Sequence, residues 1–99
     1  MTTLEVTLEM GLNALLVYAE ERVTTLSAIR QERWDAYTAA TQTRYLMTEA
    51  HGADDPRAKR WSTIADQRQA LYNIACAKFD MASEYLATIR YHMPSENDD

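Results

Sequence analysis

Hydrophobic residues recur at steps of three and four along the first half of the chain. The strongest run comprises Leu4, Leu8, Leu12, Leu15, Leu16, Ala19, Val23, Leu26 and Ile29. A sparser run follows through Trp34, Tyr37, Ala40, Tyr45 and Met47. Because this spacing is that of one face of an α-helix, it predicts a helix over about residues 3–50.

The first ten residues also fit a second pattern. Leu4, Val6, Leu8 and Met10 alternate with polar residues up to Gly11, and such alternation is typical of a half-buried strand. A single strand would find no partner in this chain and would have to pair with another subunit. We therefore favour the helix.

Residues 51–56 combine the signals that end one helix and begin another. Gly52 can adopt the left-handed conformation that closes a helix. Asp54 or Asp55 can cap the next helix, with Pro56 in its first turn. The segment therefore predicts a sharp reversal of the chain.

Helical spacing resumes after the turn and predicts a second helix over about residues 57–93. One face carries Trp61, Ile64, Ala65, Leu71, Ala75, Ala82, Leu86 and Ile89. A second apolar stripe beside it comprises Tyr72, Cys76, Phe79 and Tyr85. Pro94 ends the helix, and residues 94–99 form an acidic tail.

These elements predict an all-α, long antiparallel two-helix hairpin that forms one domain over residues 1–99. With only 2 Gly and 2 Pro, the chain has few residues suited to further turns. The apolar surface is wider than two helices need for one shared seam, since Val17, Tyr18, Trp34 and Tyr45 extend it. We expect a homodimer that covers this surface as a four-helix bundle.

Composition narrows the classes of protein. The net charge is −5, and the only tight basic cluster is Arg57, Lys59 and Arg60, which argues against nucleic-acid binding. No basic leader and no apolar run of about 20 residues is present, and Cys76 is the only cysteine. We expect a cytoplasmic protein without membrane contact.

Candidate chemistry is sparse. His51 and His92 fall at opposite ends of the predicted hairpin, and no Glu-x-x-His pair of the kind found in helical di-iron sites occurs. No glycine-rich phosphate loop and no Gly-x-Ser-x-Gly elbow is present. The sequence therefore predicts no catalytic residue, no metal site and no cofactor.

Two loose resemblances define the enzyme alternative. Glu20, Glu21, Glu32 and Asp35 loosely resemble the magnesium-binding helices of all-helical nucleotide pyrophosphohydrolases, although Thr24 stands where a third acidic residue is expected. The arginines invite comparison with small helical chorismate mutases, which surround a dianion with basic side chains; they are Arg22, Arg30, Arg33, Arg44 and Arg68. We favour a solvated charged surface for both sets.

A third alternative is a secreted helical-hairpin effector. The chain resembles W-x-G secretion substrates in its length and its central turn. Their motif places Trp and Gly two residues apart in that turn, whereas here Gly52 precedes Trp61. The resemblance is therefore one of architecture.

Aromatic residues and arginines are the remaining signal, because these types anchor many protein interfaces. The candidate interface residues are Arg33, Trp34, Tyr37, Tyr45, Arg60, Trp61, Tyr72 and Phe79. The sequence thus favours a non-enzymatic protein–protein interaction module. Its partners would be a second copy of the chain and one other protein. Such a module would be an adaptor, an assembly factor or a small inhibitor of a larger protein complex, and it would act by bridging proteins or by steric occlusion of a binding surface.

Overall fold

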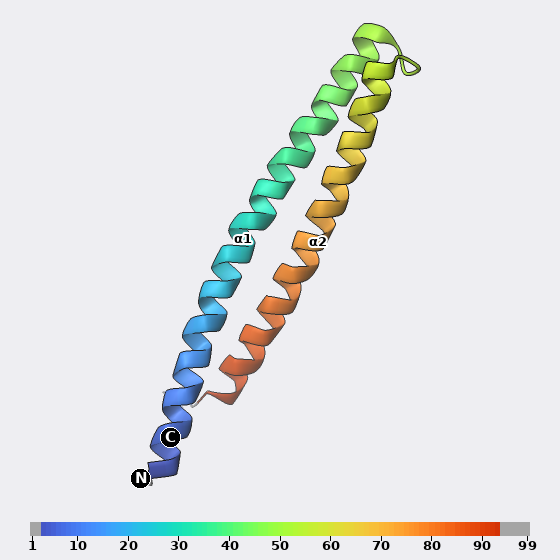
Figure 1. The fold of residues 1–99 in the computed structure, drawn as a ribbon. Coiled ribbons are helices and arrows are strands. Elements are labelled where there is room, and N and C mark those ends of the chain that lie inside the picture. The colour runs from blue at the N-terminus through green and yellow to red at the C-terminus, as the bar shows by residue number, and fades with distance from the viewer. Residues whose placement is uncertain (1–2, 94–99) are drawn as a thin grey trace.

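A computed structural model describes residues 3–93 as two long helices joined by one turn (Figure 1). Helix α1 spans Thr3–His51 and helix α2 spans Pro56–His92, and they run antiparallel. The all-α hairpin predicted from the sequence is confirmed, with bounds close to those expected. The strand alternative for the first ten residues is wrong, since the backbone is helical from Thr3. The predicted acidic tail, residues 94–99, lies outside the described residues.

The turn forms by the capping chemistry that its sequence indicates. Gly52 has a φ of 87°, in the left-handed region that favours glycine, and its N–H donates to the carbonyl of Thr48 at 2.8 Å. Of the two candidate aspartates, Asp55 is the cap, because its carboxylate accepts from the N–H of Arg57 at 2.8 Å. Pro56 occupies the first turn of α2.

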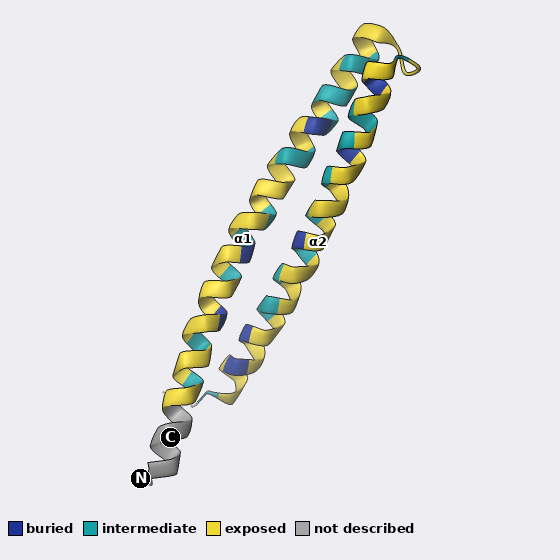
Figure 2. Cartoon of the chain, in the orientation of Figure 1, coloured by how far each residue is buried: buried dark blue, intermediate teal, exposed yellow. Residues whose placement is uncertain are grey.

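The two helices meet along a narrow seam made mainly of small side chains (Figure 2). The buried residues are Ala19, Leu26 and Ala40 on α1, and Ala58, Ala65, Ala75, Leu86 and Ile89 on α2. No large side chain is fully buried in residues 10–93. Alanine permits a close approach of two helices but leaves the core thin.

The seam of α2 repeats at intervals of seven residues, as in a coiled coil. One row comprises Ala58, Ala65, Tyr72, Phe79 and Leu86; the other comprises Trp61, Arg68, Ala75, Ala82 and Ile89. On α1, the row through Ala19, Leu26, Arg33 and Ala40 has the same interval. The second row of α1 comprises Leu16, Val23, Arg30 and Tyr37. We assign heptad position a to the rows that contain Leu16 and Ala58, and position d to the rows that contain Ala19 and Trp61, so that positions a and d form the seam.

This register corrects the stripes predicted from the sequence. Leu15, Ile29 and Leu71 belong to the predicted main stripes, but they are 43%, 36% and 43% exposed. Tyr72 and Phe79, predicted to flank the main stripe of α2, are half-buried in the seam itself. The reason is that a coiled-coil seam requires steps of three and four in strict alternation, whereas the predicted stripes used these steps in any order and so included residues beside the seam.

Candidate protein-interaction surface

The hairpin is a flat rod that measures 73 × 22 × 14 Å, so it has two broad faces. In an antiparallel pair of helices, the residues at positions c and g lie beside the seam on one face, and those at positions b and e lie on the other. Pocket linings agree with this division. Tyr18 and Arg22 of α1 share one hollow with Met81 and Tyr85 of α2, and all four occupy position c or g.

Most of the exposed large hydrophobic side chains occupy positions c and g, and we call this surface the apolar face. It comprises Leu15, Tyr18, Ile29, Leu46, Leu71, Ile74, Met81 and Tyr85. Met81 is 71% exposed and Ile74 is 51% exposed. An apolar surface of this extent is characteristic of interaction sites.

Two hollows lie along the apolar face. The first, about 430 Å³, has Leu26 and Ala82 at the seam, and the walls are Tyr18, Arg22, Lys78, Met81 and Tyr85. The second, about 260 Å³, lies nearer the turn and is lined by Arg33, Ala36, Arg68 and Leu71. Both hollows combine apolar side chains with cations from the two helices.

The cations of the apolar face have few acidic neighbours. Within residues 10–93, the close ion pairs are those of Arg57 with Asp55 at 3.0 Å and of Arg90 with Glu20 at 3.9 Å. In the same range, Glu32 is the only acidic residue at position c or g. One guanidinium nitrogen of Arg68 donates to the carbonyl of Ala36 at 3.1 Å, which fixes its position at the seam.

The opposite face carries an aromatic cluster centred on Trp34. Its ring lies 5.1 Å from the ring of Tyr72 and 5.8 Å from that of Tyr37, centroid to centroid. Trp34 is 44% exposed. The cluster therefore joins α1 to α2 while leaving part of the indole open to a partner.

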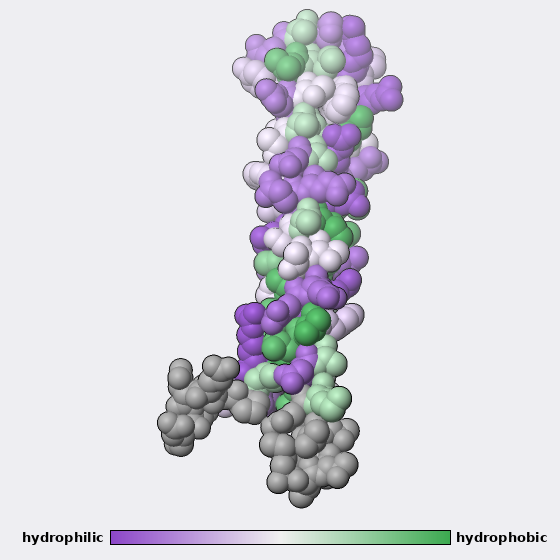
Figure 3. Space-filling view, turned by 90° about the vertical axis from the view of Figure 1, so that its left-hand side faces the viewer, coloured by the Kyte–Doolittle hydropathy of each residue, from purple (hydrophilic) through white to green (hydrophobic). Residues whose placement is uncertain are grey.

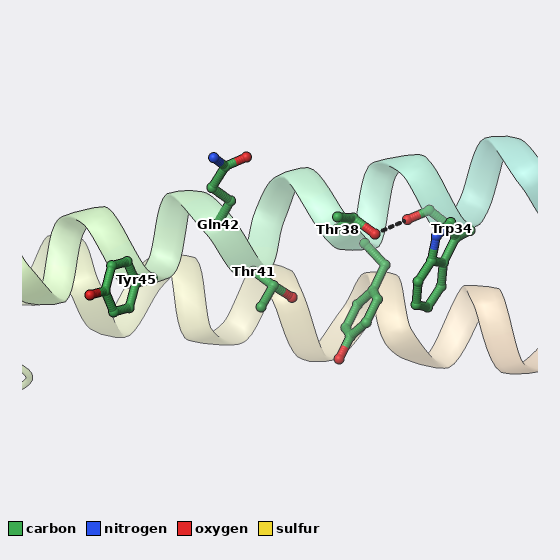
Figure 4. Close-up of a pocket in the computed structure, with 6 residues that line it drawn as sticks. Trp34, Thr38, Thr41, Gln42 and Tyr45 are labelled. Atoms are coloured by element: carbon green, nitrogen blue, oxygen red, sulfur yellow. Dashed lines mark hydrogen bonds between the residues drawn. The ribbon is translucent and has the colours of Figure 1, made fainter.

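Next to this cluster, α1 carries an open hollow of about 540 Å³ (Figure 4). Its lining is Trp34, Tyr37, Thr38, Thr41, Gln42 and Tyr45. The hydroxyl of Thr38 donates to the carbonyl of Trp34 at 2.9 Å, so it is already satisfied. Figure 4 shows Gln42 pointing away from Trp34 and Thr41.

Phe79 and Tyr72 continue the aromatic seam towards the open end of the hairpin. The guanidinium carbon of Arg30 lies 3.9 Å from the centre of the Phe79 ring, a cation–π contact. Hydrogen bonding with the Cys76 side chain raises the pKa of the Tyr72 phenol above its ordinary value of 10.0, and desolvation adds to this effect. Tyr72 is therefore neutral at physiological pH.

The structure separates the predicted interface residues into four places. Trp34, Tyr37 and Tyr72 form one cluster, with Tyr45 at the far end of the same hollow. Phe79 lies in the seam beneath Arg30. Arg33 is on the apolar face, and the neighbouring Arg60 and Trp61 lie close to the turn, exposed and half-buried respectively.

The acidic residues and arginines considered for catalysis are not gathered into one site. Glu20 pairs with Arg90, Asp35 accepts from the side chain of Gln31 at 3.0 Å, and Glu32 lies on the apolar face. No group of three or more His, Cys, Asp or Glu in residues 10–93 is arranged to hold a metal ion. The arginines spread similarly, with Arg30 on Phe79 and Arg33 beside Arg68.

Neither α1 nor α2, over the part of the chain that the structure describes, is long and apolar enough to cross a membrane. Figure 3 shows hydrophobic side chains interrupted by hydrophilic ones along the rod. No protein-family model, curated protein or solved structure matches this chain.

The interface residues predicted from the sequence are aromatic residues and arginines, and none of them is among the eight exposed hydrophobic residues of the apolar face. Five of those eight were predicted only as members of apolar stripes or of the wider apolar surface. The sequence did not predict Ile74, Met81 and Leu46 as interface residues, because each is a common aliphatic residue in a helical sequence. A signal was present, since a strict seven-residue register places all three at position c. That register requires the seam to be known, and two adjacent stripes on α2 left the seam ambiguous.

Proposed function

We propose that this protein is a non-enzymatic protein-interaction module. A rigid helical hairpin completes a helical bundle with a protein partner, and it thereby bridges that partner to another protein or blocks one of its binding surfaces. The observation that carries the proposal is the apolar face. Its aliphatic and aromatic side chains are exposed on both helices, and no segment of residues 10–93 covers them.

The size of this face supports a stable interface. A standard protein interface buries about 800 Å² on each partner, and the broad side of the hairpin measures 73 × 22 Å. The thin alanine seam supports the same conclusion, because an added helix would bury the large residues that the hairpin leaves exposed.

Two neighbouring residues provide a matched test of the proposal. Ile74 lies on the apolar face, while Asn73 lies at position b on the opposite face. We would replace each in turn with a photo-crosslinking phenylalanine derivative and irradiate the protein in its native cells. We expect discrete crosslinked protein species from position 74 and none from position 73. Equal labelling from both positions would contradict the proposal.

The enzyme alternative has its own test. We expect no change in melting temperature when the protein is titrated with Mg²⁺ and nucleoside triphosphates, or with small dicarboxylates. A rise of several degrees with either would indicate a ligand site and would contradict a purely steric role, because ligand that binds only the folded state stabilises it.

The homodimer predicted from the sequence is a second assembly that would cover the apolar face. Light scattering on the purified protein tests it directly. A mass of twice 11.4 kDa would support a four-helix bundle of two hairpins, and a mass of 11.4 kDa in dilute buffer would leave the face open to another protein.

A further inference from the structure

The two hollows of the apolar face follow one another between α1 and α2, and we call the surface that runs through both of them the groove. Tyr18 and Ala36 mark its ends on α1, about 27 Å apart at 1.5 Å per residue. That length matches five turns of a third helix. The half-buried Ala82 at its floor leaves room for side chains that project from such a helix.

The charged side chains that line the two hollows are all cationic. Arg22 and Lys78 line the first hollow, and Arg33 and Arg68 line the second. The whole chain carries a net charge of −5, so this concentration of cations runs against its composition. Within residues 10–93, none of these four cations forms a close ion pair, and cations beside an apolar groove are complementary to carboxylates that flank apolar anchors.

We propose that the groove binds an acidic amphipathic helix of a partner protein. Leucine-type or aromatic anchors of that helix would enter the two hollows, and its Glu or Asp side chains would pair with Arg22, Lys78, Arg33 and Arg68. This inference rests on the proposed function and specifies the chemistry of the partner.

The charge of the apolar face favours an acidic helix over a second copy of the chain as the occupant of the groove. Two apolar faces laid against each other would bring Arg22, Arg33, Arg68 and Lys78 of both copies into one interface, with only Glu32 to offset them. Like charges buried together oppose association. A different, acidic helix supplies the missing countercharges.

The shape of the apolar face favours a partner helix over an anionic membrane. A helix that lies in a membrane interface inserts a protruding apolar side between lipid headgroups. Here Leu26 and Ala82 are recessed at the seam between cationic and aromatic walls. That form accommodates side chains of a folded partner.

The test is a selection from a displayed library of 21-residue helical peptides. Leucine would occupy the apolar positions of each peptide, and the flanking positions would vary among Glu, Lys, Gln and Ala. With the natural protein as bait, we expect Glu to exceed Lys at the flanking positions by about tenfold. A selected peptide should bind about tenfold more weakly to the Arg22→Glu/Lys78→Glu variant.

A matched control makes the same change in net charge on the opposite face of the hairpin. Lys59 and Arg90 lie at positions b and e on the opposite face, so the Lys59→Glu/Arg90→Glu variant should keep its affinity for the peptide. Circular dichroism would verify that both variants remain helical. Equal loss of binding in the two variants would overturn the inference.

Two further measurements test a second copy of the chain and an anionic membrane as alternative occupants of the groove. Light scattering that shows a dimer blocked by Ile74→Glu would overturn the acidic partner and leave the proposed function standing. Binding to vesicles of phosphatidylserine and phosphatidylcholine, without any selected helix, would overturn both. Selected helices with no preference for Glu would overturn the inference alone.

Discussion

Asp55 shows how one side chain sets the geometry of the turn. Its carboxylate accepts from the N–H of Arg57 at 2.8 Å and from the guanidinium Nε at 3.0 Å. These two hydrogen bonds with Arg57, together with the positive charge of its side chain, lower the pKa of Asp55 below its ordinary value of 3.8. The same contact raises the pKa of Arg57.

We predict that Asp55→Ala lowers the melting temperature at pH 7 by a few degrees, because α2 loses its N-cap. A carboxyl group whose pKa is lowered by folding stabilises the folded state above its unfolded value, and this contribution is lost as the pH falls through the folded value. The difference between the natural protein and Asp55→Ala should therefore shrink below about pH 4. Thermal melts followed by circular dichroism at pH 7 and pH 3 provide the measurement.

Thr41 is a second residue with a distinct energetic role. Within residues 10–93, its hydroxyl is the one buried side-chain polar atom without a hydrogen-bond partner. Other threonines of α1 avoid this state. The hydroxyl of Thr43, for example, donates to the carbonyl of Ala39 at 2.9 Å.

We expect Thr41→Val to raise the free energy of unfolding by about 1 kcal/mol, because it removes an unpaired buried hydroxyl at nearly constant volume. Thr43→Val is the matched control, and it should be neutral or slightly destabilising since it deletes a hydrogen bond. Urea denaturation of both variants decides the point. A loss of stability in Thr41→Val alone would show that the hydroxyl is paired in solution.

At the scale of the elements, the alanine seam decides how α1 and α2 pack. Ala40, Ala58 and Ala65 are 0%, 1% and 2% exposed, so the helices have no space for a larger side chain at these positions. Large residues are therefore displaced to the two broad faces. The apolar face and the close contact of the helices have the same cause.

We predict that Ala65→Leu destabilises the hairpin by about 1–3 kcal/mol, as overpacking of a closed contact does. Ala70→Leu is the control, since Ala70 is exposed on the outer edge of the same helix and both residues are good helix formers. The midpoint of thermal or urea unfolding measures both. Equal stability of the two variants would show that the seam is looser than the structure indicates.

At the scale of the molecule, the hairpin is an extended object. Its radius of gyration is 21.8 Å, whereas a compact domain of 100 residues has a value of about 13 Å. The elongation follows from two helices without an internal break, and it makes the exposed surface large for the length of the chain.

Small-angle X-ray scattering should therefore give a radius of gyration near 21.8 Å for the isolated hairpin. Two hairpins packed side by side in register would double the mass with little change in this value, because the length stays the same. A value near that of a compact domain would show that α1 or α2 breaks and folds back, and would contradict the rod.

The two helices, their bounds and the turn could be predicted from the sequence, because they depend on local chemistry. Gly52 is followed by Asp55 and Pro56, and few other breakers occur. The aromatic anchors were also visible as residue types, although their grouping was not. Trp34 and Tyr72 are far apart in the chain, and only the antiparallel register brings their rings to 5.1 Å.

Which apolar stripe is the seam and which is the exposed face could not be predicted, because it depends on how the two helices pack. The steps of three and four that predict a helix also fit Leu15, Ile29 and Leu71, and these remain exposed. Packing selected the rows that contain the buried alanines, because two helices approach most closely where side chains are smallest and keep contact at a seven-residue interval. That choice left the aliphatic side chains and the cations of the groove together on one side of the molecule.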